Sequence, residues 1–397
     1  MLTAGIIAEY NPFHNGHAYQ IRTARSLGAT HVVAVLGGAF TQRGDCAAVD
    51  KFTRARAALL CGADLVIELP LPYAVSSAER FAFGGVALLD SLGCVDTLVF
   101  GSECGDTDLL THAAKAVDDP LFSEALKGFL NQGLVFPKAR QLALAQTMGE
   151  DSAAVLEQPN NILGTEYIKW LLRLNSPITP VTIARTGAAH GSDISSGQIA
   201  SASLVRKRML AGEEWRFFVP PQAADLYSHA IEKGHAPCSL SRLERAVLAR
   251  MRTITKDELL RLPDVTEGLE GRILKAARTA KSLDELYLLI KSKRYTLSRI
   301  RRIVLCAYLG VTSDLQLQSP PYIRVMGFNS RGKEILSRAK DTAKLPILTS
   351  LARCAEVSQT AAQFANLEAQ ASDIFALCSP QVLACGLDFT AKPVIIE

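Results

Sequence analysis

Two histidines of this chain, His14 and His17, flank Gly16 in the segment NPFHNGH, directly after the apolar run GIIA. The residues that follow have helical spacing, so this segment is predicted to be the turn that joins a first strand to a first helix. Such a turn presents unpaired backbone N–H groups and the positive end of a helix dipole to an anion. Gly16 leaves room against the backbone, and both imidazoles can donate to phosphate oxygens. We therefore expect the triphosphate of a nucleotide to bind here. The alternative is that both histidines are incidental surface or packing residues.

A second group of polar residues stands far along the chain, at the start of the helical pattern IASASLVRKRML. Ser201 and Ser203 fall in its first turn, where hydroxyl and N–H groups can hold phosphate oxygens, and Arg206 can neutralise the charge of a departing pyrophosphate. Serine at a helix start is also an ordinary N-cap. Two helix starts that face each other form a cleft, so the two segments are predicted to share one site.

The first two hundred residues alternate between apolar runs and helical patterns. Runs rich in β-branched residues are expected as strands at 4–8, 31–36, 64–68, 96–100 and 181–184, and helices are expected at 16–27, 51–62, 77–92 and 160–175. A helix in the connections implies an α/β fold with a parallel, Rossmann-like sheet and right-handed crossovers. Ligands of such sheets bind at the carboxyl ends of the strands. The segments NPFHNGH, GGAFTQRGD, ELPLPY and GSE follow the first four strands and are all predicted to lie there.

The pattern changes after about residue 212. We expect a catalytic α/β domain over 1–212, a mainly helical domain over 213–315 and a small mixed segment over 316–397. Between residues 281 and 310 there are seven basic and two acidic residues, a local excess of five positive charges against +4 for the whole chain. A basic helix with an interleaved tyrosine suits RNA phosphates and a stacked base, although a charged run is often only a solvated face. The candidates for tRNA contact are Lys291, Lys293, Arg294, Tyr295, Arg299, Arg301 and Arg302.

The composition excludes several classes of protein. At 397 residues, with 48% hydrophobic and 21% charged residues, the chain has an ordinary globular composition and is long enough for two domains. Its nine cysteines include no C-x-x-C pair and no zinc-site spacing, which indicates reduced thiols and no metal-ligating motif. The N-terminus lacks the features of a signal peptide and no apolar run approaches a membrane span. We expect a cytoplasmic protein with no membrane contact and no obligate protein partner.

Longer segments of the chain resemble a known family. HNGH and IASASLVR resemble the two signatures of the HxGH nucleotidyltransferase superfamily. GIIAEYNPFHNGH, GGAFTQRGDCAAVDKFTRARAAL, VFGSE, PNNILGTEYIKWL, KRYTLSRIRRIVL and YIRVMGFNSRGKEIL are together similar to the bacterial tRNA(Met) cytidine acetate ligase family, along nearly the whole chain. The resemblance implies activation of acetate with ATP to acetyl-adenylate, followed by acetylation of N4 of the wobble cytidine of elongator tRNA(Met). Magnesium is expected with the ATP.

Roles of single residues follow from the same resemblance. It implies that His14, His17, Ser201, Ser203 and Arg206 stabilise the transition state. The residues implied in ATP binding are Ile7, Ala8, Glu9, Tyr10, Asn11, Pro12, Phe13, His14, Asn15, Gly16, His17, Ala18, Tyr19, Gln20, Gly101, Asn160, Asn161 and Arg185. Without the resemblance, Gly101 is interpreted as a turn glycine, Asn160 as a helix cap and Arg185 as a surface ion-pair residue.

Several positions keep two interpretations. Gln42 and Arg43 are candidates for orienting acetate or the incoming cytidine, and Lys51 and Arg54 are candidates for phosphate contacts, against structural roles for all four. His31 and His190 have no identifiable partner. Two other functions remain alternatives: another HxGH nucleotidyltransferase that acts on a small metabolite, or an RNA-binding module with a non-catalytic nucleotide site.

Overall fold

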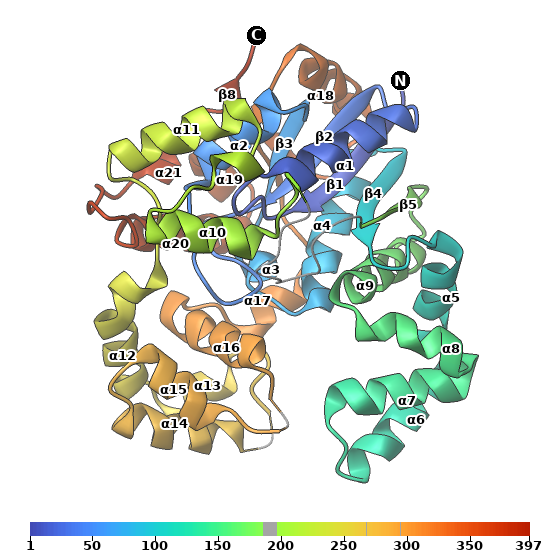
Figure 1. The fold of residues 1–397 in the computed structure, drawn as a ribbon, viewed down its shortest axis with the longest axis vertical. Helices are drawn as coiled ribbons and strands as arrows, with labels where there is room; N and C mark the ends of the chain where they lie inside the picture. Colours follow the sequence, from blue (N-terminus) through green and yellow to red (C-terminus); the bar gives the residue numbers. More distant parts are fainter. Residues whose placement is uncertain (186–196, 267, 294) are drawn as a thin grey trace.

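The computed structural model describes residues 1–185, 197–266, 268–293 and 295–397. Five parallel strands form its centre, in the order β5-β4-β1-β2-β3 (Figure 1). They are β1 (Thr3–Ala8), β2 (His31–Gly37), β3 (Leu65–Leu69), β4 (Thr97–Ser102) and β5 (Thr179–Ala184). Ala8 is paired with Leu36 and Ser102 with Ala184, so the carboxyl ends of these strands meet at one edge of the sheet. The α/β prediction is confirmed.

Helices cover both faces of this sheet. Successive side chains of a strand point to opposite faces, so Ile6 and Val32 lie in one core while Ile7 and Val33 lie in the other. On the face of Ile6 lie α1 (Asn15–Ser26), α2 (Lys51–Leu60), α10 (Ala202–Ala211) and α11 (Pro221–Glu232); on the face of Ile7 lie α3 (Leu71–Ala74), α4 (Ala78–Leu92) and α9 (Pro159–Arg173). The sheet is therefore the middle of three layers, and its strands are buried on both faces.

The C-terminal segment completes this sheet instead of forming a region of its own. β6 (Ile323–Phe328) pairs antiparallel with β3, and β7 (Ile347–Leu348) and β8 (Val394–Ile395) pair with β6. The segment also contributes α18 (Ser330–Thr342), α19 (Leu351–Ala355), α20 (Gln359–Ala376) and α21 (Leu387–Thr390), and α17 (Ser313–Leu317) spans its start. An antiparallel strand that joins an edge from more than 250 residues away leaves no local signal in the sequence, so the sequence does not predict how residues 316–397 pack on the sheet.

Two helical lobes extend from the sheet on the side of the strand ends (Figure 1). One contains α12 (Glu244–Thr253), α13 (Lys256–Leu260), α14 (Leu269–Thr279), α15 (Leu283–Ile290) and α16 (Leu297–Leu309); the other contains α5 (Thr107–Val117), α6 (Pro120–Asn131), α7 (Phe136–Met148) and α8 (Glu150–Ala153). The first lobe lies within residues 213–315, where a helical domain is expected, whereas α11 of the same range packs on α2 and so lies against the sheet.

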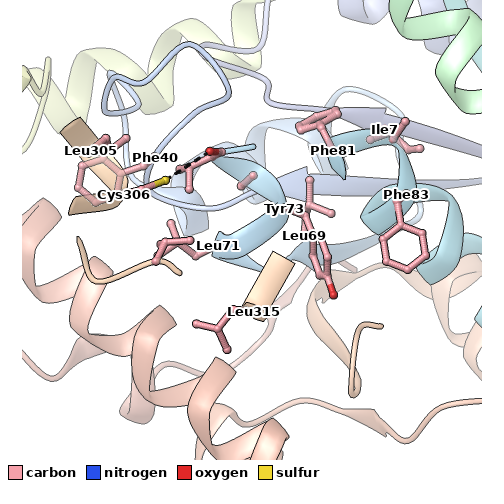
Figure 2. Packing of buried hydrophobic residues seen from close by; sticks show 14 of the residues in the cluster. Ile7, Phe40, Leu69, Leu71, Tyr73, Phe81, Phe83, Leu305, Cys306 and Leu315 are labelled. Atoms are coloured by element: carbon pink, nitrogen blue, oxygen red, sulfur yellow. Dashed lines mark hydrogen bonds between the residues drawn. The ribbon is translucent and has the colours of Figure 1, made fainter. Parts of the chain in front are cut away.

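The first lobe is attached to the sheet through buried contacts. Figure 2 shows Leu305 and Cys306 of α16 beside Phe40 and Leu71, and the Cys306 thiol donates to the Val75 carbonyl oxygen at 3.8 Å. All of these side chains belong to one buried cluster. The position of α16 is therefore fixed relative to the strand ends. Among the described residues, no helix has the length and apolarity needed to span a bilayer.

Candidate active site

A cavity of about 210 Å³ opens at the carboxyl ends of the strands. The side of β1 and α1 supplies Ile7, Ala8, Glu9, Tyr10, Asn11, His14, His17 and Gln20; the start of α10 supplies Ser201, Ala202, Ser203 and Arg206; and the remaining predicted residues in its wall are Gln42, Arg43, Gly101, Asn160 and Arg185. A smaller adjoining cavity of about 70 Å³ is also lined by His14, His17, Gln20, Gly101 and Arg185, together with Gly16 and Tyr19. The two helix starts that lie some 185 residues apart in the sequence therefore share one site.

The first turn of α1 is held by its own two histidines. His14 is the N-cap, and its Nδ1 accepts from the Gly16 N–H at 3.0 Å. His17 Nδ1 accepts in turn from the His14 N–H at 3.2 Å. Because a neutral imidazole carries one proton, an accepting Nδ1 requires that the proton sits on Nε2. The backbone of α1 therefore sets both histidines in the tautomer that donates through Nε2.

Both imidazoles are neutral near pH 7. Their rings stack with centroids 3.8 Å apart. Burial, with smaller effects of Arg185 and Arg206, lowers the pKa of His14 to about 3. Burial, followed by the effects of His14 and Arg185, lowers the pKa of His17 well below its ordinary value. The histidines therefore offer hydrogen-bond donors to a phosphate, and the positive charge of the site comes from arginine.

Gly16 makes room for the His14 side chain. A Cβ at position 16 would lie 2.8 Å from Cε1 of His14 and 3.0 Å from its Nδ1. The glycine is therefore required for the His14 ring to fold over the first turn of α1, a role that the sequence interpretation did not include. At Gly101, by contrast, a Cβ would reach the side chain of Arg185 at 3.2 Å, in the wall shared by both cavities.

Two arginines hold the backbone of the turn between β1 and α1. Arg54 is fully buried and donates to the carbonyl oxygens of Val49, Glu9 and Gly37 at 2.8, 2.6 and 2.9 Å. It therefore joins the ends of β1 and β2 and has no role in phosphate contact. Arg206 reaches from α10 to the Asn11 carbonyl oxygen at 2.6 Å and also lines the cavity. This bond ties the second helix start to the first turn.

The start of α10 has the geometry expected of a capped helix. Ser201 is its N-cap, with Oγ accepting from the Leu204 N–H at 3.2 Å and lying 2.9 Å from the Ser203 hydroxyl. Both serines line the cavity. The capping interpretation and the ligand interpretation of these serines are therefore compatible, because a capped helix end still directs its N–H groups outward.

Some predicted ATP-binding residues lie outside the cavity wall. Phe13 and Ala18 are buried in the core under α1. The Asn15 side chain donates to the Gln198 and Phe217 carbonyl oxygens, and the Asn161 Oδ1 accepts from the backbone N–H groups of Glu103 and Cys104. Pro12 is buried in the turn. These residues shape the site through the backbone, because a continuous motif contains inward-facing positions that cannot touch a ligand.

Lys51 is part of a buried ion cluster. Its Nζ lies 2.5 Å from Glu68 Oε1, 2.5 Å from Asp388 Oδ2 and 3.1 Å from Glu368 Oε1. Arg324 completes the cluster through Glu68 and Asp388. The three carboxylates are close enough together to hold a metal ion. The Lys51 ammonium takes that central place, so neither a phosphate contact nor a cation site is expected here.

Of the two histidines of open role, the structure describes His31, which is not among the residues that line the cavity. His31 does have partners: its Nδ1 lies 2.8 Å from the Thr30 hydroxyl and its Nε2 lies 3.2 Å from Glu334. His190 lies outside the described residues.

The predicted RNA-contact residues that the structure describes differ in how far they are free to reach an RNA: some are exposed to solvent, and others are held by contacts within the protein. Lys291 and Lys293 are exposed, and Tyr295 is half-buried. Arg299 donates to the Asp264 carbonyl oxygen at 2.6 Å, and its guanidinium lies over the Tyr295 ring. Arg301 lies over the Tyr287 ring, and the Arg302 side chain is only 13% exposed. Arg294 is outside the described residues.

Four residues of the cavity wall carry no chemical signal in the sequence. They are Phe81 of α4, Phe100 of β4, and Leu163 and Tyr167 of α9. Apolar residues in strands and amphipathic helices are ordinarily core, and Phe81, Phe100 and Tyr167 are indeed buried. Only the fold shows that these residues also line the cavity, together with its histidines, arginines and serines.

Comparison with known proteins places these features in a wider group. Residues 1–386 match the family described as HIGH Nucleotidyl Transferase. A protein of Caldicellulosiruptor saccharolyticus, named tRNA(Met) cytidine acetate ligase, is 43% identical over 383 residues, covering 95% of this chain and 94% of its own. A protein of the same name from Thermoanaerobacter sp. (strain X514) is 41% identical over 393 residues, 97% of each chain.

Solved structures agree with these sequences. The chain is similar to Thermotoga maritima TmcAL in its apo form, with a TM-score of 0.96 and 34% identity over the full length of both chains. It is similar to the same protein bound with alpha-thio ATP, with a TM-score of 0.94. That neighbour therefore binds an ATP analogue on a fold that this chain shares from end to end.

Proposed function

We infer the activity of this chain from one premise: it belongs to the tRNA(Met) cytidine acetate ligase family, within the HIGH nucleotidyltransferases. We propose that it uses ATP to convert acetate to acetyl-adenylate, with release of pyrophosphate. It then transfers the acetyl group to N4 of the wobble cytidine of elongator tRNA(Met). Its partners are ATP, acetate and this tRNA.

The observation that carries this proposal is the meeting of the α1 and α10 starts in one cavity. Each helix start directs backbone N–H groups and a positive dipole end at the same space. Arg43, Arg185 and Arg206 also line it, while Glu9 carries the only carboxylate among the described residues of the wall. A polyphosphate is the ligand that fits a cavity with this balance of charge.

The residues have separate tasks in the first step. A carboxylate oxygen of acetate attacks the α-phosphorus of ATP, and the bond from that phosphorus to the pyrophosphate oxygen breaks. His14 and His17 donate through Nε2 to phosphate oxygens, and Ser201, Ser203 and Arg206 hold the departing pyrophosphate. Donors that are neutral and fixed by the helix backbone need no rearrangement as charge develops.

Gly101, Asn160 and Arg185 are proposed to hold the nucleoside. All three line the main cavity, and the Asn160 amide also donates to Glu103 at 2.6 Å, which fixes its orientation. Gln42 and Arg43 line the same cavity from the turn after β2 and are proposed to orient acetate or the cytidine. In the second step the N4 amine attacks the acetyl carbonyl carbon, the bond from that carbon to the AMP oxygen breaks, and N4 loses one proton to the departing AMP phosphate or to water.

Magnesium is proposed to enter with ATP. The protein offers it little, because among the described residues of the wall only Glu9 has a carboxylate, and that group accepts from the Gln42 N–H at 2.7 Å. A magnesium ion keeps several waters and binds substrate phosphates readily. It would neutralise phosphate charge, and no cage of protein ligands is proposed for it.

The RNA is proposed to lie against the lobe of α12–α16, with Lys291, Lys293 and Tyr295 as contacts. The lobe adjoins the strand ends that form the cavity (Figure 1). We place the reaction in the cytoplasm, and the nine cysteines, all free in the structure, are typical of a reducing compartment.

The test is acetate-dependent release of pyrophosphate by the purified protein, measured with and without elongator tRNA(Met). We expect release to require acetate, and acetylcytidine to appear in the tRNA. Pyrophosphate release with a different acid and no acetyl transfer would favour a nucleotidyltransferase of small metabolites. Binding of tRNA without any turnover of ATP would favour the non-catalytic alternative.

A further inference from the structure

The second turn of α16 rests directly on the loop that forms one wall of the proposed ATP cavity. Gly44, in the turn after β2, has a φ of +74°, and a Cβ there would lie 2.5 Å from the backbone carbon of Arg301 and 2.5 Å from the backbone nitrogen of Arg302. This is contact of backbone with backbone, which leaves no space for a side chain. The lobe proposed to bind RNA therefore meets the proposed catalytic site at this point.

The side chain of Arg302 bridges the two parts. Its Nη1 donates to the Gln42 carbonyl oxygen at 3.3 Å, and its Nη2 donates to Asp264 Oδ2 at 3.2 Å. Only 13% of the side chain is exposed. A guanidinium with two protein acceptors and so little exposed surface is poorly placed to reach an RNA phosphate.

Gln42 connects this bridge to the cavity. Its backbone carbonyl accepts from Arg302, its backbone N–H donates to Glu9 Oε1 at 2.7 Å, and both Gln42 and Glu9 line the cavity. Arg302 thus reaches the wall of the cavity through a single residue, while remaining outside the wall itself.

The loop does not need Arg302 to keep its shape. It is closed by its own bonds, in which the Thr41 N–H donates to the Asp45 carbonyl oxygen and the Gly44 N–H donates to the Thr41 carbonyl oxygen, both at 2.9 Å. What the bonds within the loop do not fix is where the loop stands relative to β1. The Gln42 N–H supplies part of that constraint through Glu9, and Arg302 and the Gly44 contact supply the rest by holding the loop against α16.

We propose that Arg302 is a positioning residue for acetyl-adenylate formation, which holds Gln42 and Arg43 in the cavity wall and makes no contact with tRNA. The inference rests on the function proposed above. It assigns to α16 a role in positioning the wall of the ATP cavity, in addition to any role in RNA binding. A displacement of about 1 Å in a group that orients substrate can lower the rate of reaction by about 100-fold.

The experiment compares Arg302→Ala and Arg302→Lys with Arg278→Ala, an exposed arginine of α14 in the same lobe. Acetate-dependent pyrophosphate release gives kcat and KM for ATP, and titration of tRNA against salt gives its affinity and salt slope. We expect Arg302→Ala to lower kcat about 10- to 100-fold, with the KM for ATP, the tRNA affinity and the salt slope within about twofold of the wild type. The kcat of Arg302→Lys should lie between those of Arg302→Ala and the wild type, because a single ammonium cannot span both acceptors. Arg278→Ala should match the wild type.

Asp264→Asn provides a second variant that leaves Arg302 in place. It weakens the bond that orients the guanidinium, so kcat should fall in the same direction and by less. If Arg302→Ala instead weakens tRNA binding, lowers the salt slope by about one and leaves kcat unchanged, then Arg302 is an RNA contact and the inference is wrong. The inference is also wrong if Arg302→Ala, Arg302→Lys and Asp264→Asn all lower kcat by the same factor and all lower the melting temperature by the same amount. That result would show a merely structural role.

Failure of the proposed function would look different. In that case the wild type would release no pyrophosphate with acetate. The same variants would then be compared by calorimetric binding of a non-hydrolysable acetyl-adenylate analogue. Weaker binding by Arg302→Ala than by Arg278→Ala would keep the inference about the wall, and equal binding would reject it.

Discussion

His17 accepts a hydrogen bond from the backbone N–H of His14 at 3.2 Å, and the two imidazole rings stack with centroids 3.8 Å apart. The same pair forms the capping box that begins α1. Two bonds from backbone N–H groups to Nδ1 atoms therefore cap α1 and also set the tautomer of both histidines. The Nε2–H groups are what remains for a ligand.

Replacing His17 by alanine removes one of these donors and half of the capping box. We expect the rate of acetate-dependent pyrophosphate release to fall, by the factor that corresponds to a loss of about 2–4 kcal/mol of transition-state stabilisation. Loss of the reciprocal cap should lower the free energy of unfolding by only about 1 kcal/mol. Steady-state kinetics and urea unfolding measure the two effects.

The matched control is His112→Ala, because His112 is exposed on α5. That variant should keep both activity and stability. Near wild-type pyrophosphate release by His17→Ala would remove His17 from the proposed mechanism.

The buried histidines predict a particular dependence of stability on pH. His14 has a pKa of about 3 in the folded protein because burial disfavours its charged form, against about 6.5 in the unfolded chain. Between these values the unfolded state binds a proton that the folded state does not. The free energy of unfolding should therefore fall as the pH drops below about 6.5.

His14→Asn tests this dependence, because asparagine keeps an N-cap acceptor and cannot titrate. Between pH 7 and pH 5 its stability should fall by about 1–2 kcal/mol less than that of the wild type. Measurement by urea unfolding at several pH values decides the matter. Parallel curves for the two proteins would mean that His14 is not held neutral.

The buried cluster around Lys51 predicts a large effect on stability alone. Lys51→Met would leave Glu68 and Asp388 without their shared ammonium, and breaking a buried ion pair on one side costs about 3–5 kcal/mol. Burial, together with Glu68, raises the pKa of Glu368 to about 8, so that carboxyl is mainly protonated at neutral pH.

The double variant Lys51→Met, Glu68→Gln should recover part of that loss, because it removes an uncompensated charge. Both proteins would be compared by denaturant unfolding, and by calorimetric binding of a non-hydrolysable ATP analogue under conditions where they are folded. We expect unchanged ATP affinity. Loss of affinity in the folded variant would return Lys51 to the list of phosphate contacts.

Two basic residues close together in sequence should behave differently toward tRNA. Lys293 is exposed, so Lys293→Ala should weaken binding and lower the salt slope by about one. Arg299 is held by the Asp264 carbonyl oxygen and the Tyr295 ring. Arg299→Ala should leave the slope unchanged, although it removes the same charge.

Filter binding over a range of salt concentrations measures both slopes. The pair of variants separates contact with RNA from net charge, since both lose one positive charge. Equal changes in slope would show that the structure gives no guide to the RNA surface and that charge alone governs affinity.

Much of the fold and site was predictable because it depends on local patterns. Strands buried on both faces gave continuous apolar runs such as HVVAVL, and the turns that end them contained His14 and Gln42 at the edge where parallel sheets bind ligands. The cap at Ser201 was equally visible, since serine at a helix start is a local signal.

Other features depend on contacts between distant parts of the chain, and no local pattern records them. The sequence by itself determined the strands, the helix starts and the chemical types of the residues in the site, because periodicity and capping act over a few residues. Only the tertiary structure decided that β6 joins β3, that Lys51 and Arg54 are internal, and that Arg302 turns toward Gln42 and away from solvent. A basic residue looks the same in sequence whether it faces water or a buried acceptor, and packing alone makes that choice.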